Sequence, residues 1–201
     1  MSDANPARDF DVKTSRTLRA TPGELTALVL DPALLAQWSG KVFMHCEVVE
    51  QGDAEGRGMR LKIFSKGWMP HSFLFDICIS DLEPDRWMII DAKGDFEGQA
   101  RVDVTAISPE EVRGDIHWRT DINHPQLRFL VRLLRPVLTL NHKWAVAKIA
   151  RMAEAEIARR RRGANTTHAP APTFGIWMRF LGKSMSRRAR AKGWSKFDQR
   201  E

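Results

Sequence analysis

The stretch that decides the fold is LRFLVRLLRPVLTLNHKWAVAKIARMAEAEI, residues 127–157. Its apolar positions recur at intervals of three and four residues, which is typical of a helix with one buried face. These positions are Leu127, Leu130, Val131, Leu134, Leu138, Ala145, Ile149 and Met152. A helix of this length spans roughly 45 Å, so it must pack across most of another element. Pro136 predicts a kink, or a short first helix joined to the main one.

The chain before this helix predicts a sheet of seven strands. A first strand is expected over residues 10–19, and turn-forming segments separate the six that follow. These six are expected at 44–50, 58–64, 72–81, 86–92, 96–106 and 112–122. Short connections favour antiparallel neighbours. Alternation of apolar and polar residues predicts one buried and one solvated face.

Two short helices are expected between the first two strands, from Glu24 to Trp38. Asp31 and Pro32 separate them, because a proline starts a helix more easily than it continues one. Strands, short helices and the long C-terminal helix together predict an α+β fold with helices on a single face of the sheet.

The composition of the 201 residues, 43% hydrophobic and 28% charged, is ordinary for a globular domain. We find no long uncharged apolar segment and no apolar signal core at the N-terminus, so a cytoplasmic protein is expected. Cys46 and Cys78 form no CxxC pair and are expected to be small core side chains.

Charge divides the chain into two parts. Residues 1–158 carry 20 Lys and Arg against 23 Asp and Glu, whereas residues 159–201 carry 12 against 2. We predict a domain over residues 9–160, a linker over 161–172 and a basic amphipathic extension over 173–201. Residues 173–200 suit peripheral contact with a membrane or contact with a protein. A solvated extension remains open, nucleic acid is the least favoured partner, and no oligomeric state is indicated.

Three short segments carry a family resemblance. Asp31, Pro32, Leu35 and Trp38 form a DPxxLxxW pattern, three glycines (52, 56 and 58) lie in a strand-turn-strand segment, and NHKW occupies residues 141–144. With the order of elements, these features resemble the SRPBCC superfamily, also called START-like or Bet v 1-like, of the polyketide cyclase/dehydrase and lipid-transport type. The resemblance covers residues 9–160. It implies a helix-grip fold, in which a curved seven-stranded antiparallel sheet wraps around the long helix and leaves a cavity.

The resemblance implies that the cavity binds, and in some members transports, a small hydrophobic ligand such as a lipid or a polyketide-like aromatic. Two alternatives stay open. The same cavity suits a cyclase or dehydratase that works without a metal, and a closed cavity would suit a protein-interaction module. Binding is favoured over catalysis, and no cofactor is expected.

Side chains on the buried faces are the candidate ligand-binding residues. They are Asn141, Trp38, Trp118, Phe73, Phe75, Met59, Leu61, Leu138 and Ala145. Asn141 either orients a ligand or bonds a neighbouring strand or its own helix, since a buried amide needs partners. The tryptophans either line a pocket or fill the core. His142 follows Asn141 in the helix and is expected at the edge of the buried face.

The sequence predicts no catalytic residue. The histidines are scattered over several elements, mostly at positions whose side chains are expected to point outward. His45 and His71 face inward only if a strand is offset by one residue. HxH, HExxH and CxxC spacings are absent, so no metal site is expected. The cysteines lack an identifiable partner base for nucleophilic catalysis.

Overall fold

The computed structural model describes residues 10–69, 72–124 and 129–164. These residues form seven strands and three helices in the expected order. The elements are β1 (Phe10–Leu18), α1 (Pro22–Val29), α2 (Pro32–Ser39), β2 (Phe43–Glu50), β3 (Arg60–Lys66), β4 (Ser72–Glu83), β5 (Trp87–Gly94), β6 (Phe96–Ser108), β7 (Glu111–Ile122) and α3 (Val131–Arg161). The predictions for Leu127, His71, most of the linker and the basic extension lie outside the described residues.

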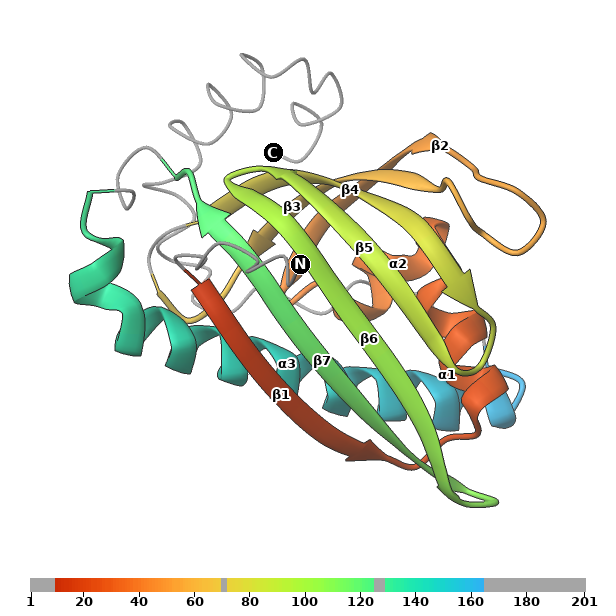
Figure 1. The fold of residues 1–201 in the computed structure, drawn as a ribbon. Helices are drawn as coiled ribbons and strands as arrows, with labels where there is room; N and C mark the ends of the chain where they lie inside the picture. The colour runs from red at the N-terminus through yellow and green to blue at the C-terminus, as the bar shows by residue number, and fades with distance from the viewer. Residues whose placement is uncertain (1–9, 70–71, 125–128, 165–201) are drawn as a thin grey trace, which may run out of the picture.

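The strands form one antiparallel sheet in the order β1-β7-β6-β5-β4-β3-β2. Strands β2 to β7 are a meander, and β1 pairs with β7 so that Val12 lies opposite Trp118. Figure 1 shows the curved sheet lying over α3, with α1 and α2 near the C-terminal end of that helix. The predicted α+β helix-grip fold is confirmed.

Local sequence explains where the short helices begin. The Thr21 hydroxyl accepts a hydrogen bond from the Glu24 N–H (3.2 Å), and the Glu24 carboxylate accepts one from the Thr21 N–H (2.8 Å). This reciprocal pair is a capping box, which satisfies two donors that the helix leaves free. Pro22 and Pro32 occupy the first positions of α1 and α2, where a missing N–H costs nothing.

The long helix α3 begins later than predicted. Leu130 is its N-cap residue and therefore lies outside the helical repeat. Its side chain is 48% exposed, so its predicted place on the buried face is wrong. Pro136 lies within the continuous helix, so no separate first helix precedes it in the described ranges. Although α3 has 31 residues, neither it nor any other helix of these ranges is long and apolar enough to cross a bilayer.

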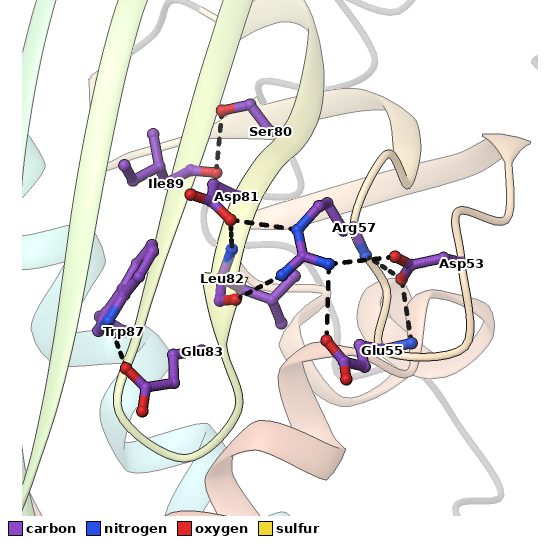
Figure 2. A network of polar contacts seen from close by, with 9 residues as sticks. All are labelled: Asp53, Glu55, Arg57, Ser80, Asp81, Leu82, Glu83, Trp87 and Ile89. Carbon is purple, nitrogen blue, oxygen red and sulfur yellow. Dashed lines mark hydrogen bonds and ion pairs between the residues drawn. The ribbon is translucent and has the colours of Figure 1, made fainter.

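The loop between β2 and β3 is fixed to β4 by Arg57 (Figure 2). Its Nε donates to Asp81 Oδ1 (3.1 Å) and its Nη2 to the Leu82 carbonyl (2.9 Å). Asp53 Oδ1 accepts from the backbone N–H groups of Arg57 (2.8 Å) and Glu55 (3.0 Å). These residues are surface contacts that shape the loop, and they lie away from the cavity described below.

The outer face of the sheet is not uniformly polar. Phe64, which alternation places on the solvated side, is only 1% exposed. Its antiparallel partner Leu74 is equally buried. Further along the sheet the outer face is polar, as where Arg101 pairs with Asp103 at 2.8 Å.

Candidate ligand-binding cavity

A cavity of about 300 Å³ lies between the sheet and α3. Side chains from all seven strands and all three described helices border it. Because every second residue of a strand faces the concave side, the curved sheet contributes a continuous inner wall, and α3 closes the opposite side. The volume is at the lower end of the range that is usual for small-molecule pockets.

Most of the predicted ligand-binding residues border this cavity. They are Trp38, Trp118, Phe73, Phe75, Leu138, Asn141 and Ala145. Met59 and Leu61 instead lie in the packed core, where they are 4% and 2% exposed. The cavity reaches β3 only at its far end, near Ser65 and Lys66. Contact of the bordering residues with a ligand stays a prediction.

An aromatic cluster forms part of the inner wall, with Phe96 at its centre. The Phe96 ring stacks on Phe73 with ring centroids 4.6 Å apart. It meets Phe75 and Trp118 edge to face, at 5.3 Å and 5.7 Å. Sequence alternation placed Phe96 on the buried face without marking it as a site residue. Such rings present both faces and edges, an arrangement that suits a further aromatic ring.

Asn141 holds the segment that follows β3. Its Oδ1 accepts a hydrogen bond from the Met69 N–H (3.2 Å), and its side chain is 7% exposed. The amide lies so close to Gly67 that a Cβ atom there would overlap it. The observed bond goes to the segment after β3, where a strand or the same helix was expected, and the ligand-orienting role stays a prediction.

His142 borders the cavity, although the sequence places it at the helix edge. Its ring lies 5.6 Å from that of Phe10 and 6.1 Å from that of Trp118, measured between centroids. Burial lowers its pKa to about 4, so the imidazole is neutral at neutral pH. The signal was present in the sequence: His142 follows Leu138 by four residues and precedes Ala145 by three, which puts all three on one helix face.

The cavity residues carry nitrogen donors and lack carboxylates. The indole nitrogens of Trp38 and Trp118 and Nε2 of His142 are buried with no partner among the described residues. Arg16 and Lys66 are the charged residues in the described lining, which contains no Asp or Glu. Burial lowers the pKa of the Lys66 amine. Since buried polar groups normally have partners, this composition favours a ligand with a hydrogen-bond acceptor.

Other candidate groups lie away from the cavity or are unreactive. Within residues 10–69, 72–124 and 129–164, no three His, Cys, Asp or Glu side chains cluster to hold a metal ion. His45 does not border the cavity, and His124 Nε2 bonds the Ser72 carbonyl (3.1 Å). Burial raises the pKa of the Cys46 thiol to about 12, so it stays protonated at neutral pH.

Comparison with known proteins finds similarity in structure only. No family model matches the sequence, and no curated protein matches it. The aromatase/cyclase Zhui from Streptomyces sp. R1128 is 13% identical with a TM-score of 0.59, over 78% of this chain and 98% of that chain. A START superfamily protein from Mycobacterium smegmatis is 15% identical with a TM-score of 0.57, over 75% and 98%. Truncated norcoclaurine synthase from Thalictrum flavum is 13% identical with a TM-score of 0.50, over 73% and 92%.

These matches confirm the resemblance to START-like proteins at the level of the fold. The chain has the START-like helix-grip fold, and each matched chain is covered almost completely by it. At identities of 13 to 15% the likeness carries the architecture and not the chemistry. Function therefore has to be argued from the cavity itself.

Proposed function

We propose that this protein binds a small hydrophobic ligand in the cavity between the sheet and α3. The observation that carries the proposal is an internal space of about 300 Å³ with a mostly apolar wall. Apolar burial contributes roughly 25 cal/mol per Å² removed from water, so such a wall favours an apolar ligand over water. The START and aromatase/cyclase names of the structural neighbours are consistent with this use of the fold.

The wall favours an aromatic ligand over a plain acyl chain. Phe73, Phe75, Phe96 and Trp118 present ring faces and edges around one side of the space. Aromatic pairs in these geometries contribute roughly 0.5 to 1.5 kcal/mol beyond their area. The unpartnered indole N–H groups of Trp38 and Trp118 favour a carbonyl or hydroxyl oxygen on the ligand. A polyketide-like aromatic has both features.

Fluorescence titration with N-phenyl-1-naphthylamine, a neutral aromatic dye that brightens in apolar surroundings, tests this proposal. The full-length protein should bind one dye molecule. In Ala145→Phe the new ring occupies cavity space, so affinity should fall by at least about tenfold. Ala147→Phe is the matched control, because Ala147 lies on the same helix and does not border the cavity. Equal dye affinity in both variants would contradict the proposal.

A second candidate function, a cyclase or dehydratase, is favoured by His142 alone. A neutral imidazole in the cavity wall can accept a proton from a bound substrate. An aryl poly-β-ketone thioester, followed by mass spectrometry of its products, tests this role. His142→Gln should retain dye binding and lose product formation if His142 transfers the proton. Equal conversion by both proteins would remove His142 from the chemistry.

A further inference from the structure

The outer side of α3 carries an apolar surface that faces solvent. Four of the seven exposed large hydrophobic residues in the described chain lie within residues 129–140. They are Phe129 (79% exposed), Leu130 (48%), Leu133 (77%) and Leu140 (61%). Exposed apolar residues scattered singly need no explanation, whereas a cluster marks a contact surface.

Helical geometry places Leu133 and Leu140 opposite the cavity. Leu133 and Leu140 are seven residues apart and so share one face, together with exposed Pro136. Leu138 and Ala145 border the cavity from the other face. The two leucines therefore contribute nothing to the core or to the cavity wall, and their apolar character is left without an internal reason.

Basic side chains flank the exposed leucines. Arg132 and Lys143 are exposed and lie on the same side of the helix as Leu140. From residue 131 to residue 153 the helix contains five Lys and Arg and no Asp or Glu. This charge is carried by the folded domain, where residues 1–158 are acidic overall, so it is a local feature of this helix. We call Leu133, Leu140, Arg132 and Lys143 the α3 outer patch.

We propose that the α3 outer patch docks the protein on an anionic membrane surface. Leucine side chains enter the boundary between headgroups and acyl chains, while the adjoining cations pair with anionic headgroups. Charge complementarity favours an anionic membrane over a second copy of the chain, because two copies would bring the same cations together. Docking would place the cavity wall one helix diameter, about 10 Å, from the lipid.

Co-sedimentation of the full-length protein with phosphatidylcholine vesicles, with and without phosphatidylserine, tests the proposal. The wild type should bind the phosphatidylserine vesicles. The double variant Leu133→Gln/Leu140→Gln removes apolar surface without changing charge and should lose roughly tenfold or more in partition. Ile107→Gln is the matched control, since Ile107 is 51% exposed on β6, and its partition should equal that of the wild type.

The comparison is made within the full chain so that any contribution of the basic extension is the same in every protein. Substituting Arg132 and Lys143 by Gln should remove most of the difference between the two vesicle types. Unchanged partition of the leucine variant would overturn the proposal. Failure of the wild type to bind either type of vesicle would also overturn it. Analytical ultracentrifugation gives the third contrary outcome: a dimer that the leucine variant dissociates, with vesicle binding unaffected, would assign the patch to self-association.

Discussion

The two halves of α3 are held to the molecule in different ways, and the C-terminal half is fixed by charged side chains. Arg161 donates two hydrogen bonds of 2.7 Å to the Glu24 carboxylate. Arg160 reaches Asp31 at 3.4 Å and Glu156 at 3.0 Å. These contacts join the helix to α1 and to the start of α2. This end of the helix is therefore an anchor with a defined position.

The N-terminal half borders the cavity on one side and solvent on the other, and the cavity continues along the C-terminal half as far as Ala153. Leu138 and Ala145 face the cavity, while Leu133 and Leu140 are exposed. Asn141 ties this half to the segment after β3 through Met69. The contrast shows that charged contacts secure the C-terminal end of the helix, whereas the cavity lies along its middle, from Leu138 to Ala153. A ligand that binds in this cavity would contribute stability.

The largest expected effect is a sensitivity of the N-terminal half to mild acid. Burial lowers the pKa of His142 from 6.5 to about 4, so the unfolded chain binds the proton first as pH falls. The free energy of unfolding should therefore fall between pH 6.5 and about pH 4, by on the order of 3 kcal/mol. Urea unfolding at a series of pH values measures this fall.

His142→Gln is the control for this prediction, because it keeps a polar side chain at the position and removes the titration. All carboxylates titrate alike in both proteins, so the difference between the two curves isolates His142. The wild-type curve should drop more steeply over this window. Parallel curves would mean that the His142 ring is not buried as described.

A smaller effect is expected at the contact between Gly67 and Asn141. Gly67→Ala places a Cβ atom against the Asn141 amide and should cost about 2 kcal/mol of stability by overpacking. Asn141→Ala leaves the Met69 N–H without its partner and should cost about 1 to 3 kcal/mol. The double variant should lose less than the sum, because the small side chain removes the overlap. Simple additivity in chemical denaturation would contradict the contact.

The smallest effect concerns the anchor. Glu24→Gln should lower stability by about 1 kcal/mol, since the side chains of Glu24 and Arg161 are 30% and 40% exposed and solvent screens them. The hydrogen bond from Arg161 is the main cause that lowers the Glu24 pKa from 4.5 to about 2. The contribution of the Glu24 carboxylate to the free energy of unfolding is thus complete above pH 4.5 and is lost as pH falls toward 2. Thermal unfolding of Glu24→Gln, Arg161→Gln and the double variant checks this, and additive losses would exclude the pair.

The order and type of the elements could be predicted because each strand and helix carries its own local pattern. Alternation, turn residues and the Asp31-Pro32 break located β1 to β7, α1 and α2 to within a few residues. The start of α3 could not be predicted, because Leu130 continues an apolar repeat that the structure does not use for the core. An apolar stripe on a helix does not say whether it faces the core or a contact surface.

The candidate site was only partly predictable for a related reason. The alternation of side chains along a strand identifies which residues are buried, as for Met59 and Leu61. It does not show which of the buried residues border the cavity. That distinction depends on where α3 crosses the curved sheet, which is a tertiary property. His142, by contrast, was predictable, because its spacing from Leu138 and Ala145 puts it on the helix face that borders the cavity.

The central claim, that α3 and the curved sheet enclose a cavity for an apolar ligand, is tested most directly by locating such a ligand. Crystals of the full-length protein grown with 1-bromonaphthalene allow the bromine to be located by its anomalous scattering. We expect a bromine peak inside the fold, between Ala145, Phe75 and Trp118. A peak found only over Leu133 and Leu140, or side chains that fill the space between sheet and helix, would contradict it.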